Sequence, residues 1–371
     1  MSRLIESITL IFVVAAVASA QSPSVSPSAS GPPVPAKSAT VSPVPSATPT
    51  TEELIDSLGQ ADLQAAVTLL KNNFADPNAI NETELNRATL QGLLVRQSRG
   101  VMLLPAQTRT DTEAGAPFYS EIFEGHVGYM RPGAITSANL KAMDKKLEEF
   151  ASKKVDALIV DLRSSSTGDF ATAAEFAKRF CPKGKPLFTL RKPAARQDRA
   201  FNSDREPSFQ GLMTVLADGD TAGAAEVVAG VLRFYDKALV IGQPTAGRAA
   251  EYSDLVLPSG KVLRVAATEA VLPENHALFP EGVKPDLPVE MSMADKRQIF
   301  QSSAEKGMAP FVYETERPHL NEAALIAGTN PEIDAAEAGR RNRGRDKLPV
   351  RDPALQRALD LVTSLEVYQK R

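Results

Sequence analysis

The sequence contains no tryptophan, one cysteine, Cys181, and only three histidines in 371 residues. A single cysteine excludes a framework of intrachain disulfides. His126, His276 and His319 are far apart and lack the spacing of metal ligands, so we expect neither a metal site nor a cofactor. A strong charge of one sign is also missing: the net charge of −3 gives no reason to expect nucleic acid as a partner.

The apolar run near the N-terminus is too short to span a bilayer comfortably, since it covers only residues 8–18. It follows Arg3 and ends at Ala-Ser-Ala, residues 18–20, which is the pattern of a cleavable export signal. A buried N-terminal helix is the alternative, but the segment that follows is not typical of a folded domain. We expect residues 1–20 to be a signal peptide, the protein to be periplasmic or extracellular, and no stable membrane span to remain after cleavage.

Composition divides the remaining chain into three parts. Residues 21–51 are rich in Pro, Ser and Thr and have few large apolar residues, which predicts a disordered linker. Helical spacing of leucines then predicts a helical N-terminal region over residues 52–104. Residues 105–371 are expected to form the core, ending in an amphipathic helix that Asp352 caps and Pro353 begins.

Short apolar runs alternate with helical patterns in this core. The runs "VDALIVDLR", "LMTVLAD" and "KALVIG" predict buried strands, and helical patterns follow the first two. Further on, a hairpin is predicted around Pro258-Ser259-Gly260. Strands alternating with helices indicate an α/β fold, whose working site lies at the carboxyl ends of the strands. Three small-residue turns should therefore converge there: "SSSTG", "GDTAG" and "GQPTAG".

An ordered series of motifs resembles the C-terminal processing peptidases, also called tail-specific serine peptidases. The series comprises "GHVGYMRPG", "VDALIVDLRSSSTGD", "TVLADGDTAGAAEVVAGVL", "ALVIGQPTAGR", "EGVKPDLPVE" and the final "DPALQRAL". The resemblance implies a crotonase-like spiral of β-β-α units. It also implies a site that binds a peptide or an unfolded protein segment.

The sequence departs from this family in its substrate-recognition domain and in its catalytic residues. Family members usually insert a PDZ domain before the core, but here the intervening segment is far too short for a domain. Alignment on Glu226 places Gly223 at the family's serine nucleophile and Ala225 at a second family serine. The family's general base, a lysine, aligns with Arg248, twenty-five positions beyond Gly223 as in bacterial members.

Both substitutions remove chemistry that the family's mechanism requires. Glycine has no attacking group, and arginine stays protonated where a buried lysine can serve as a base. Each loss would remove about 4 kcal/mol of transition-state stabilisation, on the order of a thousandfold in rate. The oxyanion turn is altered too, because the family's Asn-Pro-Gly-Gly is replaced by residues 165–168. We therefore expect no functional catalytic residue at the family positions Gly223 and Arg248.

Several other polar and small residues are candidates for the oxyanion loop or the peptide cleft. They are Ser164, Ser165, Ser166, Thr167, Gly168, Thr221 and Ala224. Turn hydroxyls commonly serve local hydrogen bonding, and no base adjoins these in sequence. Asp169 and Glu226 begin helices and are interpreted first as caps. His126 is placed in a strand with no assigned role, and Cys181 is interpreted as a small buried thiol.

Three functions remain open from the sequence. The first is an exported, catalytically inactive peptidase homologue that binds a peptide in its cleft by strand addition, with Arg248 contacting a carboxylate or carbonyl. The second is an active serine-type endopeptidase that uses a relocated Ser or Thr. The third is a structural module of the cell envelope, for which the Pro/Ser-rich linker is a tether. The oligomeric state is not predicted.

Overall fold

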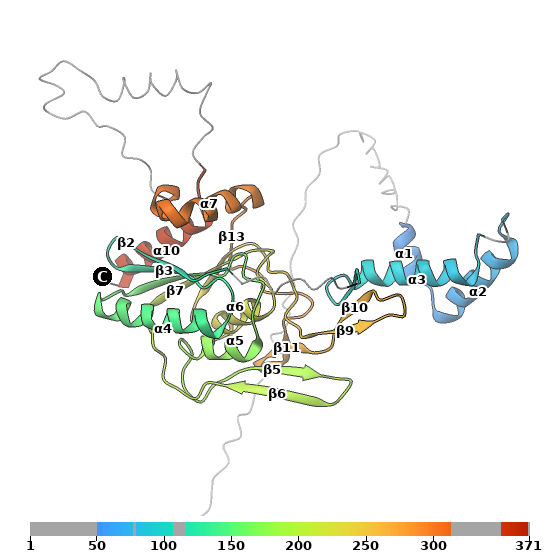
Figure 1. Cartoon of the computed structure of the whole chain (residues 1–371), viewed down its shortest axis with the longest axis horizontal. Helices are drawn as coiled ribbons and strands as arrows, with labels where there is room; N and C mark the ends of the chain where they lie inside the picture. The colour runs from blue at the N-terminus through green and yellow to red at the C-terminus, as the bar shows by residue number, and fades with distance from the viewer. Residues whose placement is uncertain (1–49, 77–78, 107–115, 313–349, 370–371) are drawn as a thin grey trace, which may run out of the picture. The chain divides into compact units, whose positions relative to one another are not determined.

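A computed structural model describes residues 50–76, 79–106, 116–312 and 350–369 of the chain (Figure 1). The predicted signal peptide and nearly all of the predicted linker lie outside these ranges. The described residues divide into two compact units, one formed by residues 50–75 and the other by the described residues from 76 onward. Among the described residues, no helix has both the length and the apolar character needed to cross a membrane.

The first unit contains two helices, α1 (Thr51–Asp56) and α2 (Gln60–Asn73). The two helices are separate because the backbone is extended at Gly59, just before α2 begins. Thr50 and Glu53 form a reciprocal capping box that fixes the start of α1.

The second unit is built around a six-stranded sheet with the order β13-β8-β7-β4-β3-β2. Strands β3, β4, β7, β8 and β13 run parallel, whereas β2 pairs antiparallel with β3. The three predicted buried strands are β4, β7 and β8. The bounds are β2 (Tyr119–Phe123), β3 (Val127–Arg131), β4 (Ala157–Asp161), β7 (Leu212–Ala217), β8 (Leu239–Gly242) and β13 (Leu287–Pro288).

Two smaller antiparallel sheets complete the strands. One has the order β1-β10-β9, and its β9–β10 pair is the hairpin predicted around Pro258-Ser259-Gly260. The other has the order β12-β11-β5-β6. Their bounds are β1 (Val101–Leu104), β9 (Tyr252–Val256), β10 (Val262–Ala266), β5 (Pro186–Lys192), β6 (Gln197–Asn202), β11 (Glu269–Leu272) and β12 (His276–Ala277).

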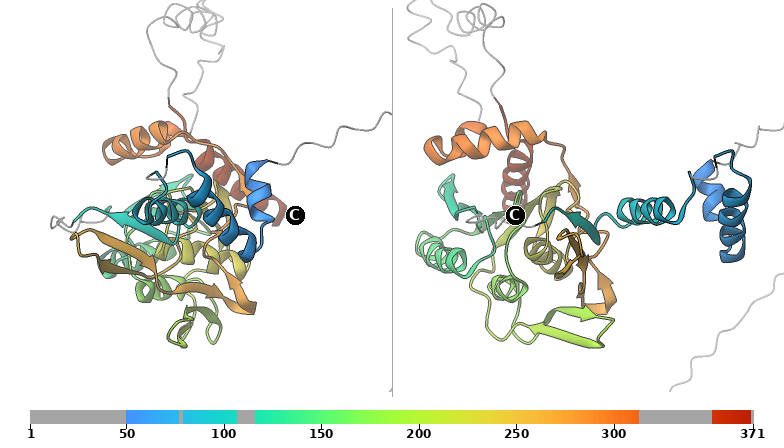
Figure 2. Two further views of the ribbon diagram at one scale, coloured as in Figure 1. Left: turned by 90° about the vertical axis from the view of Figure 1, so that its right-hand side faces the viewer. Right: turned by 45° about the vertical axis from the view of Figure 1, so that its right-hand side comes forward.

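Helices cover both faces of the six-stranded sheet (Figure 2). One face packs against α4 (Ser137–Ser152), α5 (Phe170–Ala177) and α6 (Ala224–Phe234). The opposite face packs against α7 (Met293–Lys306) and α10 (Pro353–Gln369). The remaining described helices of this unit are α3 (Glu82–Arg96) and the 3₁₀ turns η1 (Pro273–Asn275) and η2 (Ala309–Phe311).

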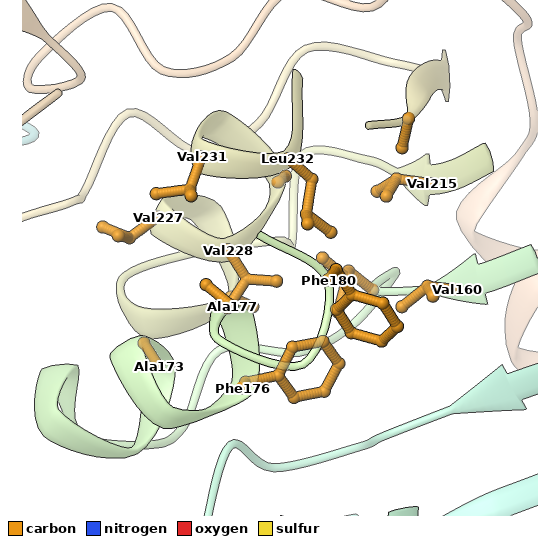
Figure 3. Close-up of a cluster of buried hydrophobic side chains, with 14 of the residues drawn as sticks. Val160, Ala173, Phe176, Ala177, Phe180, Val215, Val227, Val228, Val231 and Leu232 are labelled. Carbon is orange, nitrogen blue, oxygen red and sulfur yellow. The ribbon is translucent and has the colours of Figure 1, made fainter. Parts of the chain in front are cut away.

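The core under α5 and α6 is formed by small and branched apolar side chains (Figure 3). Val227, Val228 and Val231 of α6 are fully buried, and they share one apolar cluster with Phe176 and Phe180, the latter just beyond α5. Each such side chain contributes about 1.5–3 kcal/mol when removed from water. This packing fixes α6, and therefore the turn that precedes it, against the sheet.

The α/β fold class predicted from the sequence is confirmed. Strands and helices alternate along the chain, with β-β-α successions such as β2-β3-α4 and β6-β7-α6. The helical N-terminal region is present as well, in α1, α2 and α3.

A buried ionic cluster joins the end of β4 to the start of α10. Arg163 pairs with Asp161 at 2.6 Å and with Asp352 at 2.7 Å, and all three side chains are almost fully buried. Burial alone would raise the pKa of the Asp161 carboxyl, but the charge and hydrogen bonds of Arg163 lower it overall. Asp352 also accepts a hydrogen bond from the Leu355 backbone N–H, as expected for the cap of α10.

Asp352→Asn should lower the free energy of unfolding by about 3 kcal/mol, because it removes one charge from a buried cluster while keeping a capping side chain. Urea denaturation followed by circular dichroism measures this change. Asp360→Asn on the same helix is the control: its side chain is exposed, and we expect a change within about 0.5 kcal/mol. Equal stability of the two variants would contradict a role for the cluster.

Candidate functional site

The three predicted turns meet at the carboxyl ends of the parallel strands β4, β7 and β8. The Ala222 N–H donates to the Ser165 carbonyl at 3.0 Å, which joins the first turn to the second. The Ala246 N–H donates to the Thr221 carbonyl at 2.9 Å, which joins the second turn to the third. The candidate site is therefore a set of turns held together by backbone hydrogen bonds.

Gly223 lies where β7 leads into α6, with φ 58° and ψ −118°. This conformation is strained for any residue that has a Cβ. There is nevertheless room for a side chain, because a Cβ at Gly223 would meet nothing closer than the Arg248 carbonyl oxygen at 4.0 Å. The turn thus has the geometry of a sharp strand-to-helix elbow without an attacking group.

Arg248 lies beside Gly223, in the turn that follows β8. Its backbone N–H donates to Glu226 Oε2 at 2.8 Å. Its half-buried guanidinium group forms no hydrogen bond or ion pair with any residue that the structure describes. Arg248 is therefore a cation without a counter-ion in the described part of the chain.

Glu226 joins the two key turns: it lies in the first turn of α6, where its carboxylate interacts with the backbone of the N-cap residue Gly223, and it also reaches the turn after β8. Its buried carboxylate accepts hydrogen bonds from Thr245 Oγ1, from the Gly247 N–H at 2.7 Å and from the Arg248 N–H at 2.8 Å. Burial raises the pKa of this carboxyl, although these donors act in the opposite direction. The side chain therefore holds the 245–248 turn against the start of α6.

Asp218 and Lys296 organise the second turn, and neither was predicted as a site residue. Asp218 Oδ1 accepts hydrogen bonds from the backbone N–H groups of Asp220 at 3.0 Å and Thr221 at 3.2 Å. Lys296, which is only 3% exposed, reaches the turn from α7 and pairs with Asp218 and with Asp220 Oδ2 at 2.9 Å. No sequence signal distinguishes Lys296 from a solvated helical lysine.

The candidate hydroxyls have different environments. Thr221 Oγ1 is buried and donates to the Leu162 carbonyl at 2.9 Å, so it serves a structural hydrogen bond. Ser165 Oγ is buried and has no hydrogen-bond partner among the residues described. Of the other candidates in these turns, Ala224 is buried. The exposed ones are Ser164, Ser166, Thr167 and Gly168.

The first turn is shaped by two close backbone features. Ser164 has φ 63°, an uncommon conformation for a non-glycine residue. Gly168 has φ 143°, and a Cβ there would lie 2.5 Å from the Ile135 carbonyl oxygen, so only glycine fits.

The remaining sequence candidates lie outside this cluster of turns. Asp169 caps α5 by accepting the Thr172 N–H at 2.8 Å, as predicted. His126 is in the turn before β3 and not in a strand, and its Nδ1 lies 2.9 Å from the Glu124 carbonyl oxygen. Cys181 is fully buried, and burial raises its pKa to about 12, so the predicted inert thiol is confirmed.

Comparison with known proteins assigns this arrangement to a class. Residues 126–289, which include the three turns, match the family described as peptidase family S41. The chain is 27% identical over 174 residues to the chloroplastic carboxyl-terminal-processing peptidase 2 of Arabidopsis thaliana, covering 47% of this chain and 34% of that protein. It is 24% identical over 173 residues to the carboxyl-terminal-processing protease of Synechocystis sp., covering 47% and 40%.

A solved structure of a putative peptidase from Parabacteroides merdae is also similar, with 17% identity and a TM-score of 0.49 over 65% of this chain and 85% of that one. The chain spans about a third to two fifths of the length of the two relatives named above. Residues 126–289 form a peptidase S41 domain. The protein is a homologue of the carboxyl-terminal-processing peptidases.

Gly223→Ser should fold but lower the free energy of unfolding by about 1–2 kcal/mol, because the site offers space while the backbone is strained for serine. Thermal and urea denaturation measure the difference. Gly219→Ser in the same turn is the matched control: its Cβ meets nothing within 4 Å and its φ is not in the strained range. A neutral Gly223→Ser would show that the elbow conformation is not retained.

Proposed function

We propose that the protein is an exported peptidase S41 homologue that has lost Ser–Lys proteolysis and binds a peptide or an unfolded protein segment at the retained site. Gly223 in the elbow turn carries this proposal. The turn, the helix after it and the 245–248 turn are all in place, yet no side chain is available to attack a carbonyl. Arg248 supports it further, because a guanidinium group does not accept a proton under ordinary conditions.

Substrate contact is proposed to be direct, without a separate recognition domain. Only fourteen residues lie between the end of β1 at Leu104 and the start of β2 at Tyr119, which is too few for a PDZ domain. An extended peptide would then be held by the site itself, through backbone hydrogen bonds and a charge-assisted contact to Arg248. Export rests on residues 1–20, and a periplasmic or extracellular location follows from it.

An active hydrolase with a relocated Ser or Thr is the alternative to be tested. Lys296 reaches the second turn, but its ammonium group is paired with the carboxylates of Asp218 and Asp220. Among the described residues, its hydrogen bonds go to these carboxylates, and none goes to a candidate hydroxyl. A third possibility, a structural envelope module, places the function in the linker, and deleting residues 21–49 in a pull-down would separate that case from binding at the site.

The purified protein should not cleave unfolded proteins, whereas the double variant Gly223→Ser, Arg248→Lys should gain slow cleavage, because it restores a hydroxyl and a titratable amine at the family positions. Release of fluorescent fragments from reduced, unfolded casein measures the rate. The variant Gly219→Ser, Arg248→Lys is the matched control, since its serine lies in the same turn at the wrong position.

Turnover by the unmodified protein that survives repurification and disappears in Arg248→Ala would overturn the inactive assignment. Labelling of the unmodified protein by a fluorophosphonate probe at Thr221 or at residues 164–167 would support the relocated nucleophile instead.

A further inference from the structure

Two arginines, Arg99 and Arg248, lie at the turn formed by residues 247–248. Arg248 extends from the turn itself and has no partner among the described residues. Arg99, from the segment between α3 and β1, places its Nη1 3.0 Å from the position that a Cβ of Gly247 would occupy. The same Nη1 donates to the Pro280 carbonyl, so Arg99 has a neutral acceptor but no carboxylate partner in the described structure.

Tyr252 connects these two arginines. Its hydroxyl donates to the Arg99 carbonyl at 2.6 Å, which fixes the backbone from which the Arg99 side chain extends. Burial raises the pKa of Tyr252, while the positive charge of Arg248 acts in the opposite direction, so the phenol and this guanidinium are electrostatic neighbours. Arg99 and Arg248 therefore belong to one local environment.

The acidic groups around this environment are already occupied. Glu226 accepts three hydrogen bonds inside the protein and is fully buried. Glu251 pairs with Arg199 at 2.6 Å, and Asp254 pairs with Arg264 at 2.7 Å. The two arginines thus leave a local excess of positive charge without a counter-ion among the described residues.

Gly223 lies close to the backbone of this turn and leaves open space there, because the nearest atom that a Cβ at Gly223 would meet is the Arg248 carbonyl oxygen at 4.0 Å. The adjoining helix α6 begins at Gly223, which has no side chain that could accept a hydrogen bond from the N–H groups of the first helical turn. Ser165, whose carbonyl accepts the Ala222 N–H at 3.0 Å, adds a buried hydroxyl without a described partner next to this turn.

We propose that Arg99 and Arg248 bind a carboxylate group carried by a peptide, beside the turn at residues 247–248. This inference rests on the proposed peptide binding and names the group that is recognised. Guanidinium groups form paired hydrogen bonds with carboxylates, and each such contact is stronger than one between neutral groups. A chain's terminal carboxylate and an Asp or Glu side chain offer the same chemistry, and the experiment separates these two sources.

The test uses the full mature chain and an array of random-sequence twelve-residue peptides. Each peptide is made with a free or amidated C-terminus, and with or without Asp and Glu, and Kd values follow from fluorescence anisotropy. Arg248→Gln and Arg99→Gln should each weaken binding of carboxylate-bearing peptides about tenfold or more, and binding should weaken as salt is raised. Arg233→Gln at the other end of α6 is the matched control, because it removes the same charge from an arginine paired with Asp286.

Loss of binding on amidation alone identifies a terminal carboxylate, and loss on removal of Asp and Glu alone identifies a side chain. Equal binding of all four peptide forms, unaffected by either arginine variant, overturns the carboxylate site while leaving peptide binding intact.

N-acetylalanine and its amide, titrated against the arginine Nε–H signals in NMR spectra, distinguish the remaining cases. If no peptide binds but N-acetylalanine alone shifts the Arg99 and Arg248 signals, the carboxylate site stands and the proposed peptide function fails. If neither probe binds, both proposals are overturned.

Discussion

The buried carboxylate of Glu226 is the interaction on which the geometry of the site depends. It belongs to the first turn of α6, yet it accepts hydrogen bonds from Thr245, Gly247 and Arg248 in the turn after β8. Moving that turn away would leave a buried carboxylate without partners, which is far more costly than losing an exposed contact. Glu226 therefore fixes the position of Arg248 relative to Gly223.

This arrangement separates the scaffold of the site from its chemistry. The turns are held by backbone bonds, by Glu226, and by Asp218 with Lys296, and none of these contacts requires a serine at position 223 or a lysine at position 248. The local fold of the site is therefore compatible with a glycine at position 223 and an arginine at position 248. A site of this kind keeps a defined shape and acquires a different charge, because a guanidinium group remains cationic where a lysine amine could lose its proton.

The sequence predicts the parts of the fold that are encoded by neighbouring residues. The apolar runs of β4, β7 and β8 and the turn at Pro258-Ser259-Gly260 are local signals, and all of them appear in the structure. Pairing between distant segments is not encoded locally: β1 is a four-residue strand that pairs with β10, and β6 is exposed and polar. The same limit applies to the site, where a motif comparison locates Gly223 and Arg248. The burial of Lys296 and the bridging role of Glu226 depend on tertiary contacts, as does the pairing of Arg163 with Asp352, 189 residues away.

Cys181 gives the molecule a property that is useful beyond its packing. It is the only cysteine in the sequence, it is fully buried, and its pKa of about 12 leaves almost no thiolate at neutral pH. The native chain should therefore react very little with thiol-modifying reagents. A cysteine introduced at position 223 would be the one reactive thiol, and its rate of alkylation would report directly how far solvent and small molecules reach into the elbow turn.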